Sequence, residues 1–149
     1  MADASGGRAG VIRRGTAADL AAIRGIEAGG AGAHWRPEED LAYEVWVAET
    51  EAGEVAGFAV ARSVAAGEWE LLNLAVAPAS RRQGVGAALL RRLLDEHAGV
   101  GYLEVRRSNL AAQKLYEKLG FEAVGRRAGY YQDQKSGSPE EGIVFRFQS

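Results

Sequence analysis

The chain has 149 residues, a formal net charge of −2 and no cysteine. This length suits one domain that buries a sizeable core. Positive and negative charges are nearly balanced, so no general electrostatic attraction toward nucleic acid is expected. The lack of cysteine excludes disulfides, thiolate metal sites and a cysteine nucleophile. No apolar run approaches eighteen residues and no hydrophobic signal core is present, so we expect a cytoplasmic protein that does not enter a membrane.

The N-terminal third predicts a disordered tail at residues 1–10, followed by one strand and two helices of a single domain at 11–149. The strand is predicted at Val11-Ile12-Arg13-Arg14. Thr16 and Asp19 have the pattern of a helix cap, and the apolar residues that follow are spaced to face inward on a first helix. A glycine-rich loop separates this helix from a second one, which is expected to begin at Pro37.

The rest of the chain predicts six more strands and two more helices, in an α/β domain with a mixed sheet. Three strands come first, joined by short turns, and are expected to be antiparallel. Apolar periodicity then predicts a crossover helix that ends at Gly99, a parallel strand, and a helix that Asn109 caps and Gly120 terminates. The predicted strands are Tyr43–Glu49, Val55–Ser63, Glu68–Val76, Val100–Arg106, Phe121–Arg127 and Ile143–Gln148.

The stretch after the apolar run Leu71–Val76 has the pattern of an anion site. It continues as a short loop and then Arg81-Arg82-Gln83-Gly84-Val85-Gly86-Ala87, which leads into an apolar-periodic helix. Gly84 and Gly86 lack Cβ atoms, so a ligand can approach the peptide groups closely. The first turn of a helix leaves its N–H groups unpaired and carries partial positive charge, which suits a pyrophosphate.

Three interpretations of this turn are open. A dinucleotide fingerprint fits Gly84-x-Gly86 and the later Glu104, but it requires a glycine where Leu89 stands and a first glycine directly after the strand. The acyl-coenzyme A pattern Arg/Gln-x-x-Gly-x-Gly/Ala fits completely, beginning at Arg81. The third interpretation is that the glycines only begin a helix.

Four motifs follow one another in the chain: Asn73–Val76, Arg81–Gly86, Leu103–Asn109 and Leu115–Phe121. In order and spacing they resemble the GNAT superfamily of acetyltransferases, and more narrowly its bacterial ribosomal-protein alanine N-acetyltransferase branch. The resemblance extends from Val11 to Phe147, is specific through Tyr131 and is weak before Ala48. It implies a mixed, mostly antiparallel central sheet of about seven strands, flanked by about four helices.

The resemblance also implies an activity, the direct transfer of an acetyl group from acetyl-coenzyme A, as co-substrate, to an amine. The favoured acceptor is the N-terminal α-amine of a protein, most of all a ribosomal protein that begins with alanine. We expect a monomer or weak homodimer without nucleic-acid or membrane partners. The alternatives are a small-molecule amine acetyltransferase and a regulatory acyl-coenzyme A binding module without turnover.

Acyl transfer requires a neutral amine, stabilisation of charge on the carbonyl oxygen, and protonation of the departing thiolate. Glu104 is the candidate base because it interrupts the apolar residues of a predicted interior strand, and it can act through one water. Pairing with Arg106 or Arg107 is the alternative. Tyr116 is the candidate acid, because its hydroxyl can stabilise the developing thiolate, although an aromatic core residue is equally compatible with its spacing. In the resembling enzymes the glutamate of Leu-Glu-Val-Arg accepts the proton.

The acetyl-coenzyme A site is predicted along the anion-site stretch and the strand before it. The Val76 N–H is the candidate oxyanion donor, and the Arg82 side chain is a candidate salt contact. Asn109 is expected either to contact the pantetheine arm or only to cap its helix. Backbone groups for the pantetheine arm are expected from Leu74, Ala75 and Val76, and those for the pyrophosphate from Arg82, Gln83, Gly84, Val85, Gly86 and Ala87.

The acceptor side is less defined by the sequence. Trp35, Tyr130 and Tyr131 lie where the resembling enzymes frame the acceptor peptide, and each is equally well explained by packing. The chain departs from the family in the glycine-rich approach to Trp35 and in the long polar stretch after Tyr131, so the acceptor's identity is left open. No metal site is expected, because the two histidines are far apart and belong to no ligand cluster.

Overall fold

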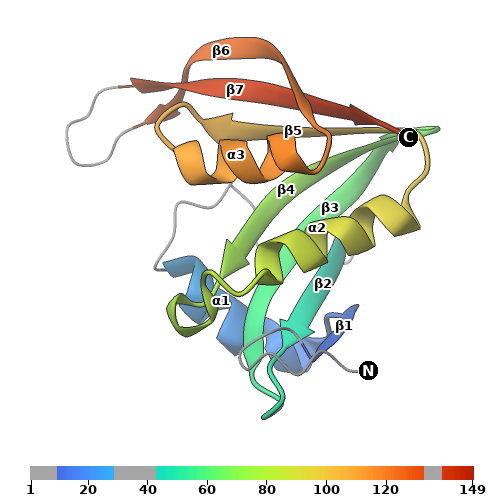
Figure 1. Ribbon diagram of the computed structural model, residues 1–149, viewed down its shortest axis with the longest axis vertical. Helices are drawn as coiled ribbons and strands as arrows, with labels where there is room; N and C mark the ends of the chain where they lie inside the picture. The colour runs from blue at the N-terminus through green and yellow to red at the C-terminus, as the bar shows by residue number, and fades with distance from the viewer. Residues whose placement is uncertain (1–9, 29–42, 133–138) are drawn as a thin grey trace. The chain divides into compact units, whose positions relative to one another are not determined.

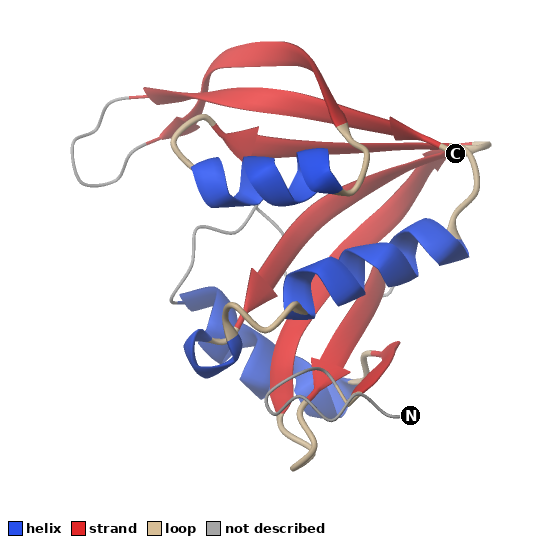
Figure 2. Ribbon diagram, viewed as in Figure 1, coloured by secondary structure: helices blue, strands red, loops and turns tan. Residues whose placement is uncertain are grey.

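The computed structural model describes residues 10–28, 43–132 and 139–149. Seven strands form a mostly antiparallel sheet in the order β1-β2-β3-β4-β5-β7-β6, and three α-helices lie in the described part of the chain (Figures 1 and 2). None of these helices is long and apolar enough to cross a membrane. The strands are β1 Val11–Arg14, β2 Glu44–Glu49, β3 Val55–Ala65, β4 Glu68–Val76, β5 Val100–Arg106, β6 Glu122–Gln132 and β7 Pro139–Gln148. The helices are α1 Leu20–Ala28, α2 Val85–Glu96 and α3 Leu110–Lys118, with 3-10 turns η1 Ala17–Asp19 and η3 Pro78–Ser80.

The predicted strands and three of the predicted helices are confirmed, with differences at their ends. β4 and β5 have the predicted bounds, whereas β6 and β7 are longer, because they go on pairing with each other as far as Gln132 and Pro139. α2 ends at Glu96, and Gly99 beyond it adopts the left-handed φ of 99° expected of a glycine there. The helix predicted at Pro37 lies outside the described residues, as does the predicted tail except for its last residue.

The chain forms two compact units, one of Met1–Arg62 with Leu71–Glu96 and one of Ser63–Glu70 with His97–Ser149. In the first unit, α1 and α2 cover opposite faces of the sheet (Figure 1). Phe58 of β3 is fully buried in a cluster with Ile23 of α1. Gly57 next to it points to the other face, where an added Cβ would lie 2.8 Å from the Ala75 carbonyl oxygen and 3.1 Å from Val85 Cγ1. Only glycine lets the end of β4 and the start of α2 approach β3 this closely.

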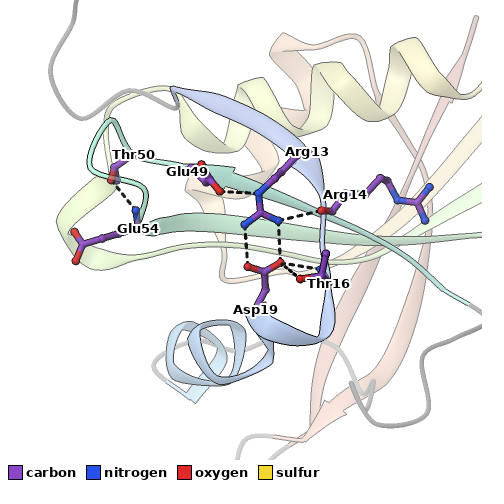
Figure 3. Close-up of polar contacts among 7 residues, drawn as sticks. All are labelled: Arg13, Arg14, Thr16, Asp19, Glu49, Thr50 and Glu54. Carbon is purple, nitrogen blue, oxygen red and sulfur yellow. Dashed lines mark hydrogen bonds and ion pairs between the residues drawn. The ribbon is translucent and has the colours of Figure 1, made fainter.

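Arg13 of β1 joins three segments of the first unit (Figure 3). Its Nε donates to Glu49 Oε2 at 2.6 Å, and its two Nη atoms donate to the two carboxylate oxygens of Asp19, each at 2.9 Å. Asp19 is buried and also accepts a hydrogen bond from the Thr16 main-chain N–H at 2.8 Å. The predicted cap is therefore present, and it begins the 3-10 turn before α1. Hydrogen bonding to Arg13, which outweighs the effect of burial, lowers the pKa of the Asp19 carboxyl.

In the second unit, β7 lies between β5 and β6 and is antiparallel to both. The junction of β3 and β4 belongs to this unit, and its Trp69 is buried and stacks on His97 with 5.2 Å between ring centroids. Gly101 of β5 lies against this indole, where an added Cβ would be 2.3 Å from Trp69 Cζ2. The indole therefore excludes any larger residue at this position of β5.

Asp19→Asn is expected to lower the free energy of unfolding at pH 7 by about 1–3 kcal/mol, because charged hydrogen bonds to Arg13 are lost. Since the pKa of Asp19 is lower in the folded than in the unfolded state, its contribution is complete above the unfolded value of about 3.9 and disappears as the pH falls through the folded value. Urea unfolding between pH 3 and pH 7 should therefore show a difference between wild type and variant that shrinks in acid. The exposed Glu54, replaced by glutamine, is the control. An equal difference at both ends of this pH range would contradict the assignment.

Candidate active site

β4 ends at Val76, and the chain passes through η3 into a tight turn before α2. Arg82 and Gly84 both have left-handed backbone, with φ of 65° and 77°. Glycine adopts this conformation without cost, whereas a residue with a Cβ is strained there, and such strain clusters at functional sites. An added Cβ at Gly84 would meet no atom within 4 Å, so the space over the turn is open.

The main-chain N–H groups from Arg82 to Ala87 have no hydrogen-bond acceptor within the described part of the chain. Ala88 is the first to donate into the helix, to the Gly84 oxygen at 3.0 Å. The N–H groups before it lie at the N-terminal end of the twelve-residue α2, where the aligned peptide dipoles leave partial positive charge. The turn therefore has the geometry and the electrostatics that a bound anion requires.

The side chains of this turn point in different directions. Arg81 Nε donates back to the Val76 carbonyl oxygen at 3.4 Å, a contact that the sequence did not predict. It ties the turn to the last residue of β4. Arg82 is exposed and makes no ion pair with any residue that the structure describes. Gln83 has a buried Oε1 that accepts no hydrogen bond from described residues.

In the second unit, Glu104 and Tyr116 lie on opposite faces of β5. Leu103 is buried and pairs with Phe145 of β7, and the Tyr116 ring lies 6.0 Å from the Phe145 ring, which places α3 on the Leu103 face. Successive strand residues point to opposite faces, so the half-buried Glu104 points away from α3. The candidate base and the candidate acid therefore lie on opposite faces of the same strand.

The Tyr116 ring is 7 % exposed and belongs to an aromatic cluster with Phe121 and Phe145. This burial fits the alternative interpretation of Tyr116 as a core residue, so a catalytic role rests on its hydroxyl alone. Asn109 caps α3, because its Oδ1 accepts a hydrogen bond from the Ala112 N–H at 3.1 Å. The cap is thus confirmed, whereas the pantetheine contact of Asn109 stays a prediction.

A glutamine that the sequence analysis did not single out also holds the turn between β5 and α3. Gln113 Nε2 donates to the main-chain oxygens of Arg107 at 2.8 Å and Arg106 at 3.2 Å. Its position one helical turn after the cap is the only signal that the sequence offers. This contact fixes the position of Asn109 and of the start of α3 relative to the end of β5.

The predicted acceptor-side residues are only partly described. Tyr130 and Tyr131 lie in β6, and the backbone of Tyr131 pairs with Glu140 of β7. Trp35 lies outside the described residues. Within the described ranges, no three histidine, cysteine, aspartate or glutamate side chains gather as metal ligands.

The sheet order and the four motifs are typical of acyl-coenzyme A-dependent transferases. A family model for the acetyltransferase (GNAT) domain matches residues 42–123. The chain belongs to the GNAT acetyltransferase family. This agrees with the four motifs and with the sheet order.

Similar proteins are known in bacteria. The chain is 48% identical over 86 residues to the ribosomal protein bS18-alanine N-acetyltransferase of Escherichia coli K12, covering 55% of this chain and 57% of that relative. It is 37% identical over 99 residues to the enzyme of the same name from Haemophilus ducreyi, covering 64% and 67%. The crystal structure of the Escherichia coli ribosomal-protein-S18-alanine N-acetyltransferase superposes with a TM-score of 0.79 at 34% identity, over 92% of each chain. The sequence match to the Escherichia coli relative thus spans little more than half of that relative's length.

Gly84→Ala is expected to weaken acetyl-coenzyme A binding about tenfold or more, which is about 1.4 kcal/mol, because the new Cβ intrudes where the main chain must meet a phosphate. The matched control is Gly53→Ala in the β2–β3 turn, where φ is 84° and the space around a Cβ is equally open. Both variants should lose a similar stability of about 1 kcal/mol, since the left-handed strain is the same. Calorimetric titration and thermal unfolding measure the two effects. Equal affinities in the two variants would count against this anion site.

Proposed function

We propose that this protein transfers the acetyl group of acetyl-coenzyme A to the N-terminal α-amine of a protein, by direct attack of the amine on the thioester. The observation that carries the proposal is the row of N–H groups from Arg82 to Ala87 without acceptors of their own. Family membership and the named activity of the Escherichia coli relative support acetyl transfer. The alanine of a ribosomal protein in that name supports an N-terminal acceptor.

The first unit supplies the proposed coenzyme site. The N–H groups at the start of α2 bind the pyrophosphate, and the exposed Arg82 adds a charged contact. The last residues of β4, Leu74 and Ala75, offer peptide groups to the amides of the pantetheine arm, as an added strand would use them. The Val76 N–H is the donor to the carbonyl oxygen as negative charge develops on it.

The second unit supplies the proposed proton transfers. Glu104 accepts the proton of the attacking amine directly or through one water, and an α-amine with an ordinary pKa of about 7.7–8.0 needs only modest help near neutral pH. The new amide bond forms as the carbon–sulfur bond breaks, and the Tyr116 hydroxyl gives its proton to the leaving thiolate.

The setting of the reaction is part of the proposal. We place the enzyme in the cytoplasm, where ribosomal proteins are made, acting as a monomer or weak homodimer without nucleic acid or membrane. A mixed surface with a net charge of −2 suits short encounters with one protein terminus rather than a lasting electrostatic complex.

Glu104→Gln is expected to lower kcat by about 10²–10³-fold at neutral pH and to leave the KM for acetyl-coenzyme A nearly unchanged, because a general base is lost. Raising the pH should recover part of the rate, since the amine then loses its proton to solvent. Tyr116→Phe should lower kcat about tenfold without that recovery. Glu117→Gln, an exposed carboxylate on α3, is the control. Full rate and an unchanged pH profile in both variants would remove these residues from the mechanism.

The acceptor is tested by competition. A peptide beginning with alanine, the same peptide with a blocked N-terminus, a polyamine and an aminoglycoside are offered together with acetyl-coenzyme A, and products are read by mass spectrometry. We expect acetylation of the free alanine peptide alone. Preferred acetylation of a small amine would indicate a small-molecule enzyme. Binding of coenzyme A without any transfer would indicate a regulatory module, and saturation by NAD but not coenzyme A would indicate a dinucleotide site.

A further inference from the structure

Asn73 is a buried amide in the apolar strand β4. Its side chain is only 6% exposed, and the buried Leu71 precedes it on the strand. A buried amide is costly unless it is hydrogen-bonded. Asn73 Nδ2 donates to Glu27 Oε2 of α1 at 3.1 Å. A charged acceptor strengthens this hydrogen bond, so α1 and β4 are joined by more than apolar packing.

The hydrogen bond lies on β4 close to the proposed oxyanion donor. Asn73 is three residues before Val76, which is the proposed oxyanion donor and the last residue of β4. Helix α1 lies at the same end of β4 (Figure 1). At about 3.3 Å per strand residue, Asn73 is about 10 Å along β4 from Val76, so we expect it to act on Val76 through the strand. Glu27 is the last residue but one of α1.

The end of β4 is held from several sides. A Cβ on Gly57 would collide with the Ala75 oxygen, so β3 and β4 are in close contact there. Arg81 holds the Val76 oxygen from the turn before α2. The hydrogen bond from Asn73 to Glu27 adds a third attachment, from α1. An oxyanion donor acts only when it is held to within a fraction of an ångström, so the attachments of this strand affect catalysis as well as stability.

We propose that Glu27 is a positioning residue for acyl transfer, which holds Asn73 and through it keeps the Val76 N–H aimed at the thioester carbonyl. This inference rests on the proposed function. It predicts that the hydrogen bond, rather than the charge of Glu27, is what the reaction needs. It also predicts an effect on kcat that exceeds any effect on coenzyme binding, because the phosphate site lies on another segment.

A polarity swap tests the proposal. Asn73→Asp places two carboxylates against each other and should lower kcat about tenfold or more, with the KM for acetyl-coenzyme A within about twofold of wild type. Glu27→Gln keeps an acceptor oxygen and should remain near the wild-type rate. The double variant Glu27→Gln/Asn73→Asp reverses donor and acceptor, so the amide at position 27 donates to the carboxylate at position 73. It should recover most of the lost kcat.

The control is Glu96→Gln, which makes the same chemical change at an exposed carboxylate 3.1 Å from Arg92 Nε. Urea unfolding of every variant separates lost folding from lost turnover. If Asn73→Asp does not fold, kcat is measured for Glu27→Ala, which removes the hydrogen-bond acceptor. A folded Glu27→Ala variant with the wild-type kcat would overturn the proposal. An active wild type whose double variant recovers no kcat also overturns it and leaves the proposed function intact. A wild type that acetylates no amine refutes the proposed function itself.

Discussion

The proposed function depends most on six main-chain N–H groups at the start of α2, which donate to no acceptor among the described residues. A buried row of such groups would destabilise a protein, but here they open onto a turn in which Gly84 leaves the space free. The strained Arg82 and the left-handed Gly84 shape this turn, and Gly57 lets α2 and the end of β4 lie close to β3. The same packing that stabilises the first unit therefore leaves these donors without acceptors, as the proposed site for a coenzyme pyrophosphate requires.

The second unit carries the candidate base and the candidate acid rather than the candidate phosphate site. Its sheet register places Phe145 opposite Leu103, and the aromatic cluster around Tyr116 then fixes α3 on that face. Glu104 points the other way by strand alternation alone. The proposed direct transfer needs no covalent intermediate, which suits a chain that has no cysteine.

Charged and polar contacts, not only apolar packing, set the position of α1. Arg13 and Asp19 fix its beginning, and the hydrogen bond between Glu27 and Asn73 fixes its end against β4. Each of these contacts uses a charged group, so it resists small shifts better than apolar contact does. Precise placement of one strand end is what a reaction based on main-chain donors demands.

The sequence alone determined the order of the elements, the bounds of β4 and β5, the cap at Asn109 and the family, because these follow from local periodicity, glycine placement and short motifs. It could not determine which strands pair beyond their predicted ends, as β6 and β7 do, because pairing lends strand structure to polar stretches that lack apolar alternation. Nor could it show that Arg81 turns back to Val76, or that Asn73 meets Glu27 across 46 positions. The first contact depends on how the turn after β4 folds back, the second on packing that brings distant segments together, and no local pattern encodes either of them.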